Sequence, residues 1–370
     1  MVKSKVIIKL YQTTRRVAIY SLFCFSCENA MSKKILIISP SWIGDCVMTQ
    51  PLYRRLHELH PQCTIDVFAP KWSMAVFERM PEVHEVLENP FGHGALALKQ
   101  RWQVGKALGK RGYDQVIVLP GSLKSALIAW ASGIKQRTGY VGESRYGLLN
   151  DIRKLDKAKL PLMVDRYTAL AHPSQADFNG HSDNPAFSIQ PASQQAALAA
   201  HQLNTQQPIM AFCAGAEYGP AKRWPPQYFA ELARRYAAQG WQIWLFGSQK
   251  DFDIAQQIQQ LSGDVCVNLC GKTTLSEAID LLACANTVIC NDSGLMHLAA
   301  ALERQLIAIY GSSSPDHTPP LSPQAHIISL HLECSPCFKR ECPLGHTQCL
   351  HNITPQMVWD TAWAEPTQTV

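Results

Sequence analysis

Short apolar segments alternate with amphipathic ones along this chain, and this alternation constrains the fold more than any other feature of the sequence. Before residue 172, strands separated by helices favour a parallel sheet with helices on both faces. The pattern predicts strands at residues 35–39, 64–69 and 115–119 and helices at 46–60 and 99–111.

The alternation stops and then restarts. Residues 172–191 are rich in Pro, Asn, Gly, Ser and Asp and lack periodicity, which indicates a linker. Beyond it the pattern predicts strands at 208–213, 242–246, 265–268, 287–290 and 306–310 and helices at 226–239, 251–261, 275–283 and 296–301. We therefore expect two Rossmann-like α/β domains, residues 31–178 and 185–354, and a C-terminal helix at 355–370. Ligands of such sheets bind beyond the carboxyl ends of the strands, which here face a central cleft.

The first thirty residues differ from the rest. Basic residues precede an apolar run at 17–27, as in a signal peptide, but no clear cleavage site of small residues follows. The interpretation that we favour is an extension, residues 1–30, outside a fold whose translation starts at Met31, because residues 33–38 already resemble a buried strand. No apolar run reaches the ~18 residues of a membrane-spanning helix.

Charge is distributed unevenly between the two halves. Residues 31–177 hold 20 Lys or Arg against 13 Asp or Glu, whereas residues 185–370 hold 9 against 14. A basic half indicates an anionic partner, although an uneven solvated surface gives the same counts. The 13 cysteines are mostly scattered among apolar neighbours, which speaks against a disulfide scaffold and favours the cytoplasm.

Two loops after predicted strands offer catalytic or binding groups. Asp45 follows Gly44 at a helix start and is either an N-cap, worth about 1 kcal/mol, or a general base in the cleft. In the loop 215–225, small residues let backbone N–H groups approach a phosphate, and Lys222 would neutralise a diphosphate. The loop lacks the Gly-Lys-Ser/Thr of a Walker motif, and a surface Lys-Arg pair is the alternative.

Two further strand ends carry polar residues. Ser293 and Gly294 open a helix whose N–H groups face the cleft, and His297 lies one turn further on the same side. The alternative is that Asp292 caps this helix and that the histidine is unrelated. Asp251 follows another strand and is a weaker candidate for contact with a ribose.

A cysteine-rich segment lies near the C-terminus. Its spacing is Cys-x2-Cys-x4-Cys-x6-Cys, with two histidines close by, and zinc is one interpretation. The spacing matches no standard zinc finger, so we favour thiols without a metal. The residues concerned are Cys334, Cys337, Cys342, Cys349, His346 and His351.

Together these segments resemble glycosyltransferase family 9, the heptosyltransferases of lipopolysaccharide core synthesis. The resemblance begins at Met31 and rests on residues 41–45, on 215–225 with its Ala-Lys-Arg-Trp-Pro run, and on 291–297. The Cys-Phe-Lys-Arg stretch at 337–340 is similar to the members that add a second heptose rather than the first.

The resemblance implies a GT-B fold whose C-terminal domain binds the donor and whose N-terminal domain binds the acceptor. It implies inverting transfer of heptose from ADP-L-glycero-D-manno-heptose to the first heptose of heptosyl-Kdo2-lipid A, with Asp45 matching the proposed base. The donor-binding candidates are Lys222, Ala216, Glu217, Asp292, Ser293, Gly294, His297 and Asp251. The acceptor-binding candidates, chosen as basic residues of the N-terminal half, are Lys99, Arg101 and Arg145.

We accordingly expect a cytoplasmic monomer, peripheral to the anionic inner face of the inner membrane, with no nucleic-acid partner. No firm cofactor is expected, and a role for Mg²⁺ is left open. Three alternatives remain: another heptosyl transfer of the same family, a sugar-nucleotide epimerase of related architecture, and a non-catalytic nucleotide-binding module. A dehydrogenase is not expected, because no Gly-x-Gly-x-x-Gly follows a predicted strand.

Overall fold

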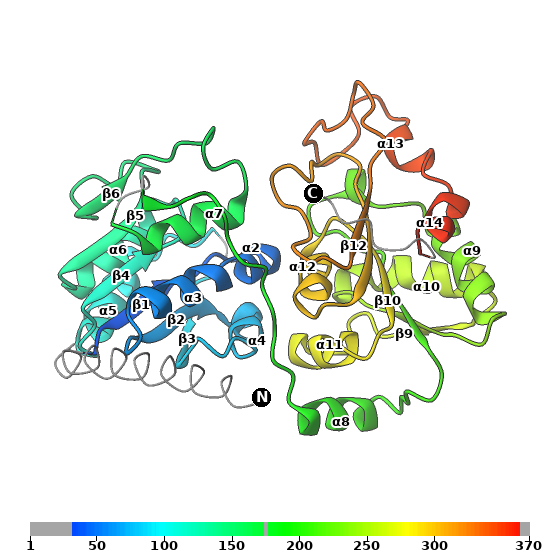
Figure 1. The fold of residues 1–370 in the computed structure, drawn as a ribbon, viewed down its shortest axis with the longest axis horizontal. Helices are drawn as coiled ribbons and strands as arrows, with labels where there is room; N and C mark the ends of the chain where they lie inside the picture. Colours follow the sequence, from blue (N-terminus) through cyan, green and yellow to red (C-terminus); the bar gives the residue numbers. More distant parts are fainter. Residues whose placement is uncertain (1–31, 93, 174–176, 363–370) are drawn as a thin grey trace, which may run out of the picture.

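A computed structural model describes residues 32–92, 94–173 and 177–362, which form two α/β domains lying side by side (Figure 1). The extension predicted at residues 1–30 and the last part of the C-terminal helix lie outside the described residues. The expected fold class, two Rossmann-like domains of the GT-B type, is confirmed.

The first domain is built on a six-stranded parallel sheet of order β3-β2-β1-β4-β5-β6. This is the strand order of a Rossmann sheet, in which the direction of winding reverses between the first and fourth strands. The strands are β1 (Lys34–Ile38), β2 (Thr64–Pro70), β3 (Glu85–Asn89), β4 (Gln115–Val118), β5 (Gln136–Tyr140) and β6 (Asp151–Arg153).

The second domain repeats this arrangement. Its parallel sheet has the order β12-β11-β10-β7-β8-β9, which is the same winding when the strands are counted from β7. The point of reversal therefore lies between β7 and β10. The strands are β7 (Ile209–Cys213), β8 (Gln242–Leu245), β9 (Cys266–Asn268), β10 (Thr287–Asn291), β11 (Gln305–Ile309) and β12 (Ala325–Ile328).

Helices cover both sheets, as the alternating pattern predicts. In the first domain they are α2 (Ile43–Met48), α3 (Gln50–Leu59), α4 (Met74–Phe77), α5 (Leu98–Gly109), α6 (Leu123–Ser132) and α7 (Met163–Thr168). In the second they are α8 (Pro191–Ala200), α9 (Pro226–Ala237), α10 (Phe252–Leu261), α11 (Leu275–Leu282), α12 (Gly294–Ala301), α13 (Gln348–His351) and α14 (Pro355–Ala362). None of the helices within the described ranges is both long enough and apolar enough to cross a bilayer.

The sequence pattern misses several elements for physical reasons. The strands β3, β6 and β12 lie at sheet edges, and β5 is polar, so none of them shows a continuous apolar run. The single helix predicted at 46–60 is two helices, because α2 ends at Met48 and α3 begins at Gln50 with Pro51 in its first turn. Proline has no N–H to continue a helix but is well accommodated in a first turn.

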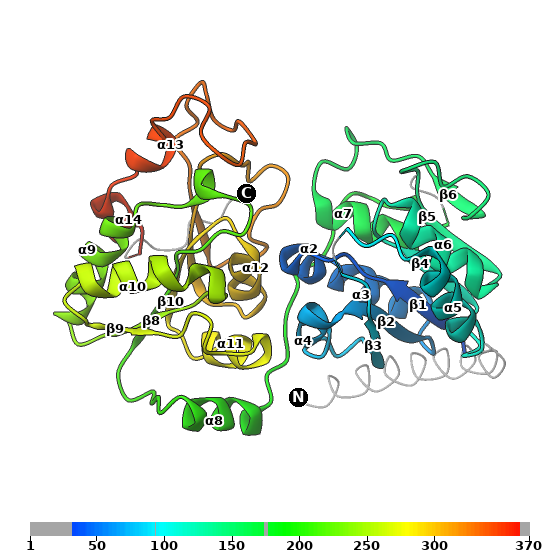
Figure 2. The ribbon, with the colours of Figure 1, turned by 180° about the vertical axis from the view of Figure 1, so that it is seen from behind.

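The two domains share an apolar interface. One buried cluster runs from Cys46 and Phe77 of the first domain to Ile279 and Met296 of the second. In Figure 2, α2 reaches α12 and α4 lies beside α11, which are the pairs in contact across the interface. This packing places the loops after β1, β7 and β10 close to one another.

The linker is tied to both domains. The amide of Gln50 in α3 bonds the backbone of Ala186, and the N–H of Phe187 donates to Ala301 at the end of α12. The C-terminal helix α14 packs on α9 of its own domain. Because α14 stays with its own domain, the described part of the chain passes between the domains only once, through residues 172–190.

Candidate active site

The loop after β1 brings Asp45 to the domain interface. The N-cap of α2 is Trp42, and Asp45 lies in the first turn instead. The interpretation of Asp45 as a helix cap is therefore wrong. A carboxylate in the first turn is favoured by the unpaired N–H groups and the positive end of the helix dipole.

Burial and one hydrogen bond set the protonation of Asp45. Removal from water raises the pKa of the Asp45 carboxyl to about 6, against a hydrogen bond from Tyr167 that lowers it. Burial also holds the pKa of the Tyr167 phenol well above its usual range, so this group stays a hydrogen-bond donor. A carboxylate of this pKa is mostly ionised at neutral pH and is still basic enough to accept a proton.

Lys222 and Asp292 form an ion pair between the loops after β7 and β10. The Lys222 Nζ lies 2.5 Å from Oδ2 of Asp292, and the hydroxyl of Ser313 donates to the same oxygen at 2.5 Å. The carboxylate is almost fully buried, whereas the ammonium is partly open to solvent. Asp292 thus orients a lysine charge at the carboxyl edge of the second sheet rather than capping α12, whose N-cap is Ser293.

The starts of α2 and α12 touch each other across the interface. A methyl group added at Gly294 would lie 2.9 Å from Cβ of Ile43, and one added at Gly44 would lie 2.6 Å from Cδ2 of His297. Only glycine fits this approach at either position. Burial lowers the pKa of His297 to about 4, so its imidazole is neutral at physiological pH.

The Ser293 hydroxyl is a polar group that can still form hydrogen bonds. Its hydroxyl is buried and finds no hydrogen-bond partner among the residues that the structure describes. Buried polar groups in native proteins are nearly always paired. The free hydroxyl and the N–H groups at the start of α12 therefore suit a ligand oxygen.

Three further donor-binding candidates follow β7 and β8, and the structure limits what each could offer a ligand. Ala216 is buried and offers a ligand only its backbone. Glu217 is exposed and forms an ion pair with Lys250. The carboxylate of Asp251 accepts bonds from the N–H and hydroxyl of Ser248, at 2.9 and 2.8 Å, and so stabilises the turn before α10.

The acceptor-binding candidates require a correction. Arg101 and Arg145 are buried, and their guanidinium groups donate to backbone carbonyls of their own domain, including those of Leu96 and Pro120. Neither presents its charge to a ligand, because each holds a loop in place. Lys99 is exposed at the start of α5 and remains available.

Sequence reasoning missed three residues of this region. Tyr167 and Ser313 carry no motif, and only the structure shows that they contact Asp45 and Asp292. Arg79 lies 2.7 Å from Asp280 of α11, with both side chains buried, and this ion pair crosses the domain interface. No local sequence signal pairs residues that lie 201 positions apart.

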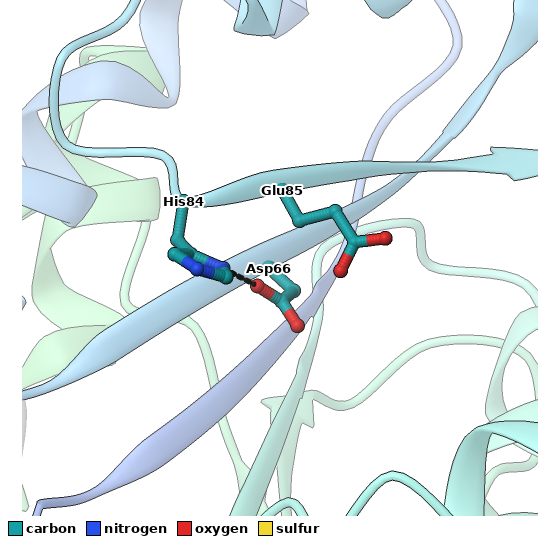
Figure 3. Close-up of side chains that lie close together, drawn as sticks. All are labelled: Asp66, His84 and Glu85. Carbon is teal, nitrogen blue, oxygen red and sulfur yellow. Dashed lines mark hydrogen bonds and ion pairs between the residues drawn. The ribbon is translucent and has the colours of Figure 1, made fainter.

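Asp66, His84 and Glu85 form a separate group of metal-binding side-chain types (Figure 3). Nδ1 of His84 lies 2.9 Å from Asp66, whose other oxygen accepts a 2.6 Å bond from Tyr113, and Glu85 pairs with Arg111. These residues lie toward the amino ends of their strands, away from the domain interface. The group is an ion-pair and hydrogen-bond network, whose carboxylates already have partners within the protein.

Comparison with known proteins identifies relatives. The sequence profile of glycosyltransferase family 9 (heptosyltransferase) matches residues 101–348. Lipopolysaccharide heptosyltransferase 2 of Escherichia coli K12 is 46% identical over 88% of this chain and 96% of its own. Lipooligosaccharide heptosyltransferase 2 of Haemophilus influenzae is 46% identical over 87% and 96%. The solved structure of E. coli ADP-heptose LPS heptosyltransferase II has a TM-score of 0.79 at 42% identity, covering 89% of this chain and 97% of that one.

Proposed function

This chain belongs to glycosyltransferase family 9, the heptosyltransferases, and we propose that it transfers a second heptose in lipopolysaccharide core synthesis. The donor is ADP-L-glycero-D-manno-heptose and the acceptor is the first heptose of the inner core, on heptosyl-Kdo2-lipid A. One observation carries the proposal: a carboxylate with a pKa near 6 stands at the start of α2, which contacts the polar start of α12.

Asp45 acts on the acceptor. Its carboxylate takes the proton from an acceptor hydroxyl while that oxygen forms a bond to the anomeric carbon of the donor heptose. The bond from this carbon to the diphosphate breaks on the opposite face, so the configuration inverts and ADP leaves. Tyr167 keeps the carboxylate oriented and ionised through its hydrogen bond.

Lys222 and the start of α12 act on the leaving group. Negative charge grows on the diphosphate as the sugar departs, and the Lys222 ammonium neutralises it from a position fixed by Asp292. The hydroxyl of Ser293 and the N–H groups that begin at Gly294 offer further hydrogen bonds. One preorganised donor of this kind is worth about 3–4 kcal/mol in other enzymes.

The direct test combines the purified protein with ADP-heptose and heptosyl-Kdo2-lipid A and follows release of ADP and formation of the product. We expect one heptose per acceptor and α/β inversion at its anomeric carbon. In Asp45→Asn, turnover falls by at least ~100-fold while ADP binding changes little. Turnover that survives this change contradicts the role of Asp45. Arms with EDTA and with added Mg²⁺ test whether a cation contributes beside Lys222.

The same assay separates the alternatives. An enzyme of the first transfer step uses Kdo2-lipid A without heptose as its acceptor. We expect this protein to form no product with that acceptor. An epimerase changes ADP-heptose without any acceptor, which product analysis in acceptor-free reactions detects. A binding module binds ADP but releases no sugar.

We further propose that the chain works at the cytoplasmic face of the inner membrane and contacts it through α5 and α6, which lie side by side on the first domain (Figure 1). The exposed rings of Trp102 and Trp130 lie 5.0 Å apart at their centres, with the ammonium of Lys106 5.3 Å from the first ring. Lys99 adds a second exposed charge. Tryptophan and lysine together suit the interface of an anionic bilayer.

Sedimentation with lipid vesicles tests this surface. We expect binding to phosphatidylglycerol vesicles, weaker binding to phosphatidylcholine vesicles, and loss of binding in Trp102→Ser/Trp130→Ser. The matched control is Leu261→Ser, which removes an exposed apolar side chain from α10 of the other domain. Equal binding by the double variant and the control contradicts the assignment.

A further inference from the structure

The cysteine-rich segment, residues 334–349, packs directly on the loop that carries Lys222. The N–H of Ala221 donates to the carbonyl of Arg340 at 3.0 Å, and the hydroxyl of Tyr218 donates to that of Phe338 at 2.8 Å. A methyl group at Gly219 would lie 2.5 Å from the Arg340 carbonyl oxygen. The position of this loop therefore depends on the order of the cysteine-rich segment.

All four cysteines of this segment line one small cavity. Its volume is about 20 Å³, and its other lining residues include His346 and Ser312. A space of this size holds about one water molecule or one ion. The hydroxyl of Ser312 is fully buried and has no hydrogen-bond partner among the described residues, so a buried polar atom lies at the cavity without a partner.

The four cysteines lie around the same cavity without being bonded to one another. All four cysteines are free thiols. Backbone N–H groups of residues 344–347 donate toward the sulfur of Cys342, and the sulfur of Cys349 lies within electrostatic range of the other three.

We propose that Cys334, Cys337, Cys342 and Cys349 bind one thiophilic divalent ion, Zn²⁺ or Fe²⁺, in a tetrahedral site. Tetrahedral sulfur ligation selects these metals over Mg²⁺ and Ca²⁺. No three of the sulfurs all lie within 4.8 Å of one another in the described chain, so binding draws the segment inward around the ion.

The charge of such a site is balanced locally. Four thiols release four protons to solvent, and four thiolates with one divalent ion carry two negative charges. Lys339 and Arg340 lie within the segment, and the Arg340 guanidinium rests 5.4 Å from the ring centre of Tyr218. The ion therefore has a structural role: it fixes the segment on which the Lys222 loop packs.

Elemental analysis of the untagged full-length protein, prepared without chelators, tests the site. We expect about one equivalent of zinc or iron per chain, as for a closed structural site; absorbance of an iron–thiolate centre distinguishes the two metals. Cys337→Ser and Cys342→Ser lose the metal. The control Cys284→Ser, a half-buried thiol after α11, keeps it. Metal below about a tenth of an equivalent after anaerobic reconstitution overturns the proposal.

A second measurement does not depend on the variants folding. Thiol titration of the native wild-type protein should gain four reactive thiols when a strong chelator is added, and protease cleavage within 334–349 should become faster. The intact mass should fit reduced cysteines after the metal is removed under acid. A mass lower by two units per bridge indicates disulfides, and thiols that react equally with and without chelator also contradict a metal site.

Discussion

Replacing Tyr167 by phenylalanine should move the acid limb of activity to higher pH. The Tyr167 hydroxyl donates to Asp45 and so favours the charged form of a carboxyl that burial raises to a pKa of about 6. Phenylalanine keeps the buried ring and removes only the hydroxyl that makes this hydrogen bond. Without this bond the charged form of Asp45 is less stable relative to the neutral form, so the pKa of Asp45 rises.

The size of the shift follows from the strength of the bond. A hydrogen bond to a charged group contributes about 1.5–3 kcal/mol, and one pKa unit corresponds to about 1.4 kcal/mol. The midpoint of the acid limb should therefore move from about 6 to between about 7 and about 8. At pH 6 the variant should retain roughly a fiftieth to a fifth of wild-type kcat/KM, and it should recover most of the difference above pH 8.5.

The assay is kcat/KM for both substrates between pH 5 and 9. His297 does not complicate the profile, because burial lowers its pKa to about 4. Tyr113→Phe is the matched control: it removes a 2.6 Å tyrosine–aspartate bond, to Asp66, on the side of the sheet away from the interface. An acid limb that stays in place in Tyr167→Phe, or that moves equally in the control, refutes the assignment of Asp45 as the base.

Three further changes test the interface. Asp45→Asn should raise the free energy of unfolding at neutral pH by up to about 3 kcal/mol. The reason is that burial raises the pKa of the Asp45 carboxyl from 3.8 to about 6 in the folded protein, so the wild type loses stability as the pH rises through that window. Thermal unfolding at pH 4 and 8 checks the sign. Gly44→Ala should lower turnover at least ~10-fold, because its methyl group collides with His297, and unfolding of the first domain should change little. Arg79→Leu leaves Asp280 buried and unpaired and should destabilise the chain by about 3–5 kcal/mol, whereas Arg79→Leu/Asp280→Leu recovers part of the loss.

Each of these has an outcome that contradicts it. Asp45→Asn with a thermal midpoint below wild type at pH 8 shows that the ionised carboxylate stabilises the fold. Gly92→Ala, where an added methyl group meets nothing within 4 Å, is the control for Gly44→Ala and must keep full turnover. If the double variant Arg79→Leu/Asp280→Leu is no more stable than Arg79→Leu alone, the unpaired charge of Asp280 is not the cause of the destabilisation.

The ends of the parallel strands could be predicted from sequence, and the groups beside them could not. Asp45, Lys222 and Asp292 lie in the segments that follow the apolar strands β1, β7 and β10. The carboxyl ends of parallel strands meet at one edge, so the convergence of these residues is a consequence of local pattern and fold class. Tyr167 reaches Asp45 from a helix 122 positions later, and no local pattern encodes that contact.

Charge alone misled where burial decides the role of a side chain. Arg101 and Arg145 are basic residues in a basic half, which made them candidates for an anionic acceptor. Both are buried, and their guanidinium groups donate to backbone carbonyls of their own domain, whereas Lys99 in α5 is exposed. Whether a guanidinium faces a ligand or a carbonyl is settled by packing, which sequence composition does not record.

Between the two described domains the chain passes once, through residues 172–190, and this makes the two halves candidates for fragment complementation. Each sheet is complete within its own half, and α14 stays on α9, so neither fragment loses a strand when the chain is divided in the linker. The apolar surfaces around α2 and α12 would then have to find each other in solution, and their association constant would report directly how strongly the two halves hold together.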